Sequence, residues 1–420
     1  MFHFIHAADV HLDSPLIGLE RYGDAPIEEI RGATRRAFEN LVELALKEDA
    51  AFLILAGDLY DGDWKDYNTG IFIARQMARL KEANIRVFIA AGNHDAASQI
   101  TRSLKLPDNV HLFSHRKAES ILLPELNVVV HGRGFAERVV PDDISQQYPP
   151  ARSGSFNIGV LHTSMNGREG HDVYAPCSID GLKTKGYQYW ALGHVHKHEV
   201  ASRDPWIIYP GNLQGRHIRE TGPKGCVIVH VEDGEVRSMR HEPVDVLRWS
   251  EVEVAAAGTK DPLEVINLAA QALDQEWTKH GGMPVVIRLR ISGTSAAHDT
   301  FRAYPEHWAA QFRAIAQEYG QGQLWIEKIL FNTQPAVDTG DWSGDEAIAT
   351  IIKELRMLAT DPSQVAGLLD DLNQLKQKLP PDLLLGPDSA DPTEPQTMDS
   401  ILSEARDLIE ARLLRGGMQP

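Results

Sequence analysis

The chain has 420 residues and a formal net charge of −17; 43% of its residues are hydrophobic and 24% are charged. This length exceeds one ordinary hydrophobic core, so we expect a soluble protein of more than one domain. The acidic balance excludes a protein that coats nucleic acid by bulk electrostatic attraction. It does not exclude a nuclease, because bound cations would offset the charge of an acidic metal site.

Cysteine usage and the N-terminus both favour a cytoplasmic location. Cys177 and Cys226 are the only cysteines, which excludes a disulfide framework and fits a reducing cytosol. The first residues, MFHFIHAADVHL, lack the basic region of a signal peptide, and no later run approaches about 18 apolar residues. We therefore expect a protein that neither enters nor spans a membrane.

Short β-branched or aromatic runs alternate with helical patterns over residues 1–243. A helix is predicted around Phe38 and Leu41, where apolar residues recur at helical spacing. Asp233-Gly234 predicts the turn of a hairpin that ends this region. The alternation predicts an α/β sandwich. The strands predicted before the hairpin are FHFIHAA, AFLILAG, RVFIAAG, NVVVHGR, FNIGVLH, YQYWALG and WIIYPG.

The rest of the chain divides into four predicted segments. Residues 244–336 have the order strand, helix, strand, helix, strand, which is typical of a small α+β domain. Residues 337–379 predict a helical segment. Residues 380–396 contain five prolines and predict an extended linker. Residues 397–420 predict a C-terminal helix with its apolar side chains on one face.

Side chains able to bind metal or to carry protons follow five of the predicted strands. Some come as D-x-H and H-x-H pairs, which aim alternate side chains to one side. Because the carboxyl ends of strands in an open α/β sheet form one rim, these groups can converge although they are far apart in sequence. The residues are Asp9, His11, Asp58, Asp61, Asn93, His94, His162, His194 and His196.

The chemistry of this set predicts a metal site. A single histidine in any of these places is ordinarily structural, so the prediction depends on their joint occurrence. Carboxylate, amide and imidazole donors without thiolate suit Mn²⁺, Fe²⁺ or Zn²⁺. There are too many ligands for one tetrahedral ion but enough for two, if one carboxylate bridges them. Two ions about 3.5–4 Å apart are the arrangement that activates a water against a phosphorus centre.

The motifs DVH, GDLYD, GNHD, LHTS and GHVH, in this order, resemble those of the calcineurin-type metallophosphoesterases. The segments IHAADVHLDSPL and YPGNLQGR make the chain similar to the SbcD-type DNA repair nucleases, in a YhaO-like subgroup. The resemblance implies a metallophosphoesterase αββα sandwich over 1–243, an α+β domain over 244–336 that caps the site and binds DNA, and C-terminal helices. The helix within 397–420 is then expected to bind the partner, and the alternative is that it packs against its own catalytic domain.

The resemblance also implies a role for each site residue. The implied ligands of one ion are Asp9, His11, Asp58 and His196. The implied ligands of the second ion are Asp58, which bridges, Asn93, His162 and His194. His94 is implied as the proton donor to the leaving group, with Asp61 orienting its imidazole. Both ions are expected to be Mn²⁺.

The function implied by the resemblance is that of a Mn²⁺-dependent DNA exonuclease. It would act in DNA repair with an SbcC-like coiled-coil ATPase as partner. The sequence does not decide whether the protein forms a homodimer. One alternative is a phosphatase or cyclic-nucleotide phosphodiesterase of the same fold, although the protein phosphatases carry GNHE and GDxVDRG where this chain has GNHD and GDLYDGD. Another is a non-catalytic scaffold, which the intact ligand set disfavours.

Six further residues near the motifs have open interpretations. Asp95, His171 and Cys177 are expected to be structural or to support the ligands. Arg216, His217 and Arg219 could contact backbone phosphate or lie in a solvated loop.

Overall fold

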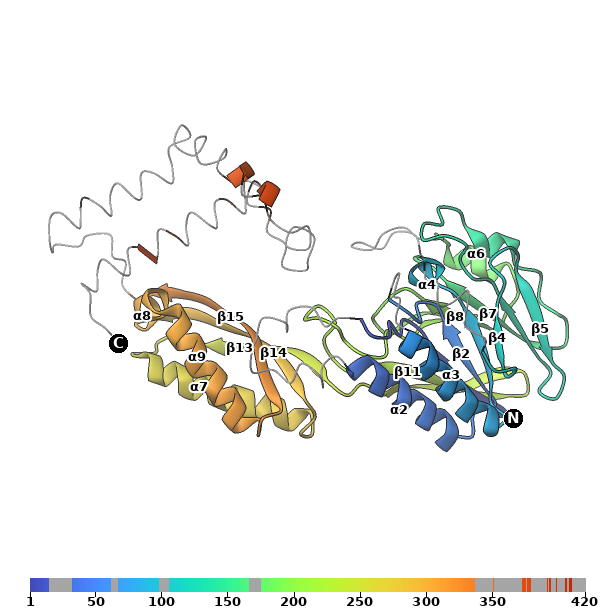
Figure 1. The fold of residues 1–420 in the computed structure, drawn as a ribbon, viewed down its shortest axis with the longest axis horizontal. Helices are drawn as coiled ribbons and strands as arrows, with labels where there is room; N and C mark the ends of the chain where they lie inside the picture. The colour runs from blue at the N-terminus through green and yellow to red at the C-terminus, as the bar shows by residue number, and fades with distance from the viewer. Residues whose placement is uncertain are drawn as a thin grey trace. The chain divides into compact units, whose positions relative to one another are not determined.

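The computed structural model describes residues 1–14, 32–61, 67–97, 106–165 and 175–336, together with a few positions beyond them: 350, 372–374, 376–378, 391, 393, 398, 405, 408 and 409. The chain forms two compact units, Met1–Trp249 and Ser250–Pro420 (Figure 1). The predicted helical segment 337–379, linker 380–396 and terminal helix 397–420 lie outside the described residues, except at these few positions.

The first unit contains a six-stranded sheet in the order β12-β11-β1-β2-β3-β4. Strands β1 to β4 run parallel to one another, whereas β11 pairs antiparallel with β1 and with β12. The strands are β1 (Phe2–Ala7), β2 (Phe52–Ala56), β3 (Arg86–Ala90), β4 (Val110–Leu112), β11 (Gly225–Glu232) and β12 (Glu235–Pro243).

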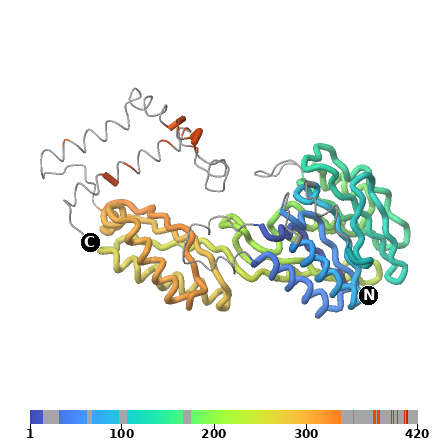
Figure 2. The backbone as a smooth tube through the Cα atoms, viewed as in Figure 1, coloured from blue at the N-terminus to red at the C-terminus, as the bar shows by residue number. Residues whose placement is uncertain are grey.

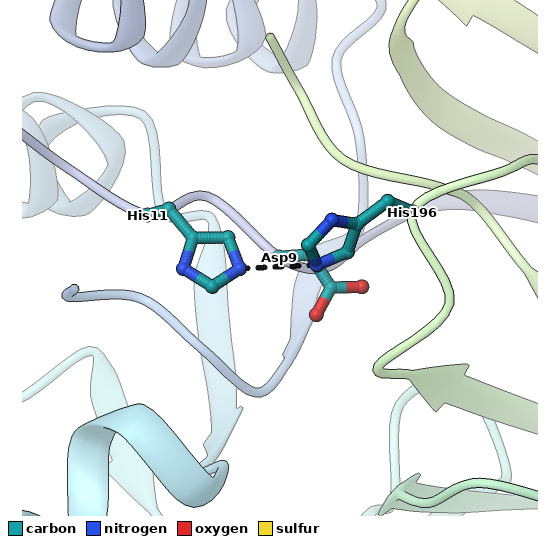
Figure 3. Close-up of side chains that lie close together, drawn as sticks. All are labelled: Asp9, His11 and His196. Carbon is teal, nitrogen blue, oxygen red and sulfur yellow. Dashed lines mark hydrogen bonds between the residues drawn. The ribbon is translucent and has the colours of Figure 1, made fainter. Parts of the chain in front are cut away.

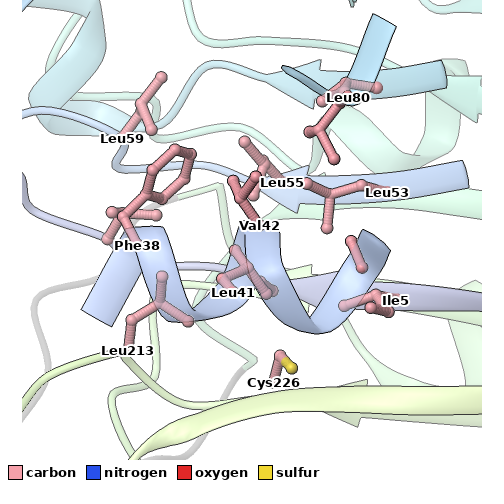
Figure 4. Close-up of a cluster of buried hydrophobic side chains, with 14 of the residues drawn as sticks. Ile5, Phe38, Leu41, Val42, Leu53, Leu55, Leu59, Leu80, Leu213 and Cys226 are labelled. Atoms are coloured by element: carbon pink, nitrogen blue, oxygen red, sulfur yellow. The ribbon is translucent and has the colours of Figure 1, made fainter. Parts of the chain in front are cut away.

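Two helices cover one face of this sheet. Helix α2 (Ala33–Lys47) buries an apolar stripe that includes Phe38, Leu41 and Val42. These side chains pack with Leu53 and Leu55 of β2, as Figure 4 shows. Helix α3 (Tyr67–Glu82) contributes to the same cluster. Burial of each such side chain contributes about 1.5–3 kcal/mol, so the cluster fixes the helices on the sheet.

A second six-stranded sheet has the order β5-β6-β7-β8-β10-β9. Its inner strands β6, β7, β8 and β10 are parallel, and the two edge strands are antiparallel to their neighbours. Its outer face packs on short helices, η1 (Ile144–Gln147) and α6 (Ile179–Lys183). The strands are β5 (Glu119–Leu123), β6 (Val128–Gly132), β7 (Phe156–His162), β8 (Tyr189–Gly193), β9 (Glu199–Arg203) and β10 (Trp206–Tyr209).

The two sheets pack face to face through a shared apolar layer. In β2, Phe52 and Ile54 point into this layer, whereas Leu53 and Leu55 face the helices. Both faces of the strand are therefore buried, which explains why its sequence is continuously apolar instead of alternating. The ring of Phe4 in β1 stacks on that of Phe52 at a centroid distance of 4.9 Å. The predicted α/β sandwich is confirmed.

Residues 248–335 form a small α+β domain with a three-stranded sheet in the order β13-β14-β15. Strands β14 and β15 are parallel, and the helices pack on one face of the sheet through apolar side chains. Helix α7 begins where the Asp261 carboxylate accepts hydrogen bonds from the backbone N–H groups of Leu263 and Glu264. The elements are β13 (Arg248–Ala255), α7 (Pro262–Lys279), β14 (Val285–Ser295), α8 (His298–Ala303), α9 (Pro305–Tyr319) and β15 (Leu324–Pro335).

The backbone trace in Figure 2 follows these elements by residue number through both units. Within the ranges that the structure describes, none of the helices combines the length and apolar character needed to cross a membrane.

Candidate metal centre

The predicted site residues lie where strands of both sheets end. Asp9 and His11 follow β1, Asp58 and Asp61 follow β2, and Asn93 and His94 open the short helix α4 (Asn93–Ala97) after β3. From the other sheet, His162 is the last residue of β7, and His194 and His196 follow β8. The predicted residues therefore do lie at strand ends, but the strands belong to two sheets and not to one rim.

Two glycines allow the ends of the two sheets to approach so closely. A Cβ atom on Gly193 would lie 1.8 Å from the carbonyl oxygen of Ala56, and one on Gly57 would lie 2.1 Å from Nδ1 of His162. Gly57 also has a φ of +95°, a backbone conformation that residues other than glycine rarely adopt. The contact that results is a hydrogen bond from Nδ1 of His162 to the oxygen of Ala56, at 3.0 Å.

Several predicted ligands have left-handed backbone conformations. The φ angles are +50° at Asp9, +46° at His11, +51° at Asp58 and +103° at His194. Such conformations cost about 1–3 kcal/mol each for most residues, with Asp and His among the better tolerated. The loop after β1 is stabilised against this cost by backbone hydrogen bonds to the loop after β2, from Asp9 to Gly57 and from His11 to Asp58, each 3.0 Å long.

Asp9, His11 and His196 form the first group of possible metal ligands (Figure 3). Nε2 of His11 lies 3.2 Å from Nε2 of His196, and Asp9 lies beside them. When two imidazole rings face each other through Nε2, the lone pairs of the two nitrogens repel unless a proton or a cation lies between them. Asp9 and His11 are at most 1% exposed, so a cation here would be largely removed from water.

Asp58 joins two further groups of possible ligands. One is His11, Asp58 and His94; the other is Asp9, Asp58 and His162. Oδ2 of Asp58 lies 3.8 Å from Nε2 of His11 and 3.4 Å from Nε2 of His162. A carboxylate that lies between two histidines in this way is suited to bridge two ions.

Asn93 and His194 both lie beside His162. Oδ1 of Asn93 is 2.9 Å from Nε2 of His162. The backbone N–H of His194 donates to both carboxylate oxygens of Asp9 at 3.0 Å, and its ring centroid is 5.2 Å from that of His162. Among the described Asp, Glu, Cys and His side chains, the three groups of possible ligands do not include His194.

His94 and Asp61 form a pair at the more open edge of the site. Nδ1 of His94 lies 3.0 Å from Oδ1 of Asp61, and the two side chains are 28% and 22% exposed. Burial lowers the pKa of His94, but the hydrogen bond to Asp61 and the charges of Asp58 and Asp61 outweigh it and raise the pKa above its usual value. His94 combines partial exposure with a raised pKa, which suits a group that meets a substrate in its protonated form.

The charges of the buried groups fit divalent cations. Burial, opposed by neighbouring histidines, raises the pKa of Asp9 to about 6. Burial also acts on His162 and lowers its pKa, but the Asp58 carboxylate outweighs this and raises the pKa to about 9. Metal binding would replace the His162 proton next to Asp58 and allow both carboxylates to stay charged. Buried oxygen and nitrogen donors without thiolate fit Mn²⁺, Fe²⁺ or Zn²⁺.

Asp95, the third polar residue of GNHD, has a structural role. Its carboxylate accepts hydrogen bonds from the backbone N–H groups of Leu59, Tyr60 and Gly92, at 3.2, 2.9 and 2.9 Å. It therefore ties the loop after β2 to the loop after β3. Burial, followed by the charge of Asp58, raises its pKa to about 6.

The other residues singled out from the sequence have varied surroundings. Cys177 is buried and accepts a hydrogen bond from the Thr163 hydroxyl at 3.2 Å, and His171 lies outside the described residues. Arg216 does reach the site, where its Nη1 lies 3.9 Å from Oδ1 of Asp61. The backbone N–H of Arg219 donates to Nδ1 of His217 at 3.3 Å.

Glu220, which no motif in the sequence singles out, also lies at the site, with its Oε1 2.6 Å from Nδ1 of His196. Glu220 stands in the same QGRHIRE segment that drew attention to Arg216, His217 and Arg219. A lone glutamate in a charged segment is normally read as solvated, so only its burial, at 6% exposed, identifies it.

Comparison with known proteins identifies related sequences. Residues 2–198 match the family of calcineurin-like phosphoesterases, and residues 249–334 match the middle domain of the metallophosphoesterase YhaO. The uncharacterized metallophosphoesterase YhaO of Bacillus subtilis is 35% identical over 296 residues, which cover 70% of this chain and 72% of the relative. A DNA double-strand break repair protein Mre11 from Methanopyrus kandleri is 24% identical over 424 residues, covering 90% of this chain and 84% of that protein.

Among solved structures, a protein of Thermus thermophilus is similar at 16% sequence identity with a TM-score of 0.34, over 58% of this chain and 99% of that chain.

Proposed function

The chain belongs to the calcineurin-like metallophosphoesterase family, and from that premise we propose that it is a two-metal-dependent DNA nuclease. The observation that carries the proposal is the convergence of Asp and His side chains from both sheets on one buried site, beside the more exposed His94–Asp61 pair. The choice of DNA as substrate is supported by the likeness to an Mre11 repair protein over 90% of this chain.

Two divalent ions, Mn²⁺ in this proposal, are assigned to the buried donors. When bound, they supply charge neutralisation at the phosphate and an activated water. The ligands proposed for the first ion are Asp9, His11, Asp58 and His196. The ligands proposed for the second ion are Asp58, Asn93, His162 and His194.

His94 is proposed to donate the proton that the departing alkoxide needs. Its Nδ1–H faces Oδ1 of Asp61 at 3.0 Å, which leaves Nε2–H for the leaving group. Asp61 itself stays ionised: burial raises its pKa, but the nearby His11 ring and the hydrogen-bonded His94 outweigh this and lower the pKa. A positioned acid of this kind contributes about 10²–10⁴-fold in rate.

A direct comparison of substrates tests the proposal. The purified protein with Mn²⁺ is incubated with end-labelled single- and double-stranded DNA, with a cyclic nucleotide and with a phosphoserine peptide at matched concentrations. Bis-p-nitrophenyl phosphate reports whether any diester is cleaved, and an Asp58→Asn preparation controls for a contaminating nuclease. Faster hydrolysis of the cyclic nucleotide or the peptide than of any DNA would establish one of the alternative functions instead.

The partner and domain roles extend the same proposal. We propose that the 244–336 domain helps to hold duplex DNA at the site, and that residues 397–420 bind an SbcC-like coiled-coil ATPase. A chain truncated after Pro395 should hydrolyse a small diester as the full chain does but fail to co-purify the ATPase. Retention of the ATPase by the truncated chain would place the partner contact elsewhere. Size measurement of the full chain decides whether a homodimer forms.

A further inference from the structure

Glu220 is held in one position by the loop that precedes it. Its Oε2 accepts hydrogen bonds from Nδ2 of Asn212 at 2.9 Å and from the backbone N–H of Arg216 at 2.7 Å. Nη2 of Arg216 and Nε2 of His217 each lie 3.5 Å from Oε1. The carboxylate therefore has its donors around it before any ion binds.

His196 is the residue to which Glu220 is directed. Oε1 of Glu220 lies 2.6 Å from Nδ1 of His196, a short hydrogen bond of the kind that an ionised carboxylate forms. Nη2 of Arg216, which can only donate, lies 3.3 Å from the same nitrogen, but the carboxylate, which only accepts, is much nearer, so we place the proton of the imidazole on Nδ1. The Nε2 lone pair is then left on the side of Asp9 and His11, with which His196 forms a group of possible ligands.

The backbone of His196 is fixed as well. Nζ of Lys224 donates to its carbonyl oxygen at 2.9 Å, and Lys224 is 7% exposed. Asn212 N–H approaches the same carbonyl at 3.4 Å. Asn212 and Lys224 thus fix the main chain of His196. The orientation of its ring then depends only on the side-chain torsion angles, which the hydrogen bond to Glu220 restricts.

We propose that Glu220 is a positioning residue of the metal centre, which holds His196 in the Nδ1–H tautomer and directs its Nε2 lone pair to the ion. The inference rests on the proposed function, in which His196 is a ligand. A carboxylate bonded to the far nitrogen of a ligand histidine fixes the tautomer and raises the basicity of the coordinating nitrogen. Loss of such a partner costs about 10- to 100-fold in metal affinity.

His162 offers an internal comparison. Its Nδ1 is hydrogen-bonded to a neutral backbone carbonyl, that of Ala56, at 3.0 Å. That contact also orients a ring but adds no formal charge behind it. The binding affinity of the ion assigned to His196 should therefore depend on the Glu220 carboxylate, and that of the other ion should not.

The first test is metal binding by the full-length chain. Glu220→Gln keeps the size and one acceptor oxygen but removes the charge. Calorimetric titration with Mn²⁺ should show one of the two sites weakened by about 10- to 100-fold and the other little changed. Glu119→Gln is the matched control, because Glu119 also lies beside a histidine, with Oε2 3.2 Å from Nε2 of His111, away from the proposed ligands.

The second test needs no metal. Nuclear magnetic resonance of ¹⁵N-labelled histidine in the metal-free wild-type protein reports which nitrogen of His196 is protonated, with a His196→Gln variant to assign the signal. The expected result is Nδ1–H in the wild type. An Nε2–H tautomer overturns the inference, and so does wild-type Mn²⁺ affinity at both sites in a Glu220→Gln protein that circular dichroism shows to be folded.

These outcomes are separable from those of the proposed function. A wild-type protein that binds Mn²⁺ but cleaves no DNA contradicts the nuclease assignment and leaves the role of Glu220 standing. A wild-type protein that binds no Mn²⁺ contradicts the two-metal assignment, while the tautomer measurement still decides whether Glu220 positions His196.

Discussion

Nδ1 of His94 lies 3.0 Å from Oδ1 of Asp61, and the ring of His94 meets that of His11 edge-on at a centroid distance of 4.9 Å. The contacts of His94 are compatible with two roles, proton donor and metal ligand. The pairing with Asp61 is what a proton donor requires, but His94 also forms a group of possible ligands with His11 and Asp58. The exposure of His94, at 28%, favours the donor role, because a donor must reach substrate.

His94→Gln should lower the turnover of DNA by about 10²–10⁴-fold, because the leaving alkoxide loses its proton source. Hydrolysis of bis-p-nitrophenyl phosphate should fall much less, since nitrophenolate departs without protonation. The metal content of the purified variant, measured by elemental analysis, should equal that of the wild type. Loss of metal together with equal losses on both substrates would show instead that His94 is a ligand.

Asp58→Asn should abolish hydrolysis of both substrates and reduce the bound metal. The proposed bridging position needs a full negative charge between two cations, and an amide supplies only a dipole. Asparagine can still accept the hydrogen bond that the backbone N–H of His94 gives to Oδ1 of Asp58 at 3.0 Å, so the fold should persist. Elemental analysis and circular dichroism on the same preparation check both points; unchanged metal content in an inactive, folded variant would remove Asp58 from the ligand set.

The fold and the ligand candidates were predictable because each is encoded locally. Continuous apolar runs such as FLILA predict strands with two buried faces, and the polar residues that end those runs fall at strand ends by necessity. The family motifs then order Asp9, Asp58 and His162 into one site without any distance measurement. Strand-end position alone also drew attention to Asp95, which the structure shows to bond only main-chain groups among the contacts described.

Features that depend on burial or on approach in three dimensions were not predictable. Nothing in QGRHIRE distinguishes Glu220, which is buried against His196, from a solvated glutamate. The close approach of the two sheets depends on Gly57 and Gly193, because a side chain at either position would collide with His162 or Ala56. The sequence likewise does not show that His94 lies near enough to His11 and Asp58 to compete for a ligand role.

Cleavage of DNA should depend on salt more strongly than cleavage of a small diester. Binding of DNA to cationic groups releases counterions, so affinity falls as salt is added, whereas a small monoanionic diester releases few. The chain itself is acidic, with a net charge of −17, so we expect the proposed contacts with DNA to be local. Rates at subsaturating substrate, measured between about 50 and 200 mM salt, check this. Parallel salt curves for the two substrates would indicate that the protein has no extended contact with DNA.

The last prediction concerns His6, which joins the two sheets beneath the metal centre. It is fully buried, with Nε2 3.1 Å from the oxygen of Leu192 and Nδ1 3.0 Å from the hydroxyl of Tyr189. A carbonyl only accepts, so Nε2 carries the proton and Nδ1 accepts from Tyr189. The neutral ring is then fully hydrogen-bonded, and burial lowers its pKa from 6.5 to about 3.

Since the folded state resists protonation of His6 and the unfolded state does not, the free energy of unfolding should fall as the pH drops below 6.5 and should continue to fall until about pH 3. His6 alone should account for about 2 kcal/mol of the loss between pH 7 and pH 5. Urea unfolding of the wild type and of His6→Gln at both pH values, with a chelator present so that metal binding does not contribute, measures this difference. The variant should be less stable at pH 7 but lose about 2 kcal/mol less on acidification; an equal loss in both proteins would show that His6 is not the group that titrates.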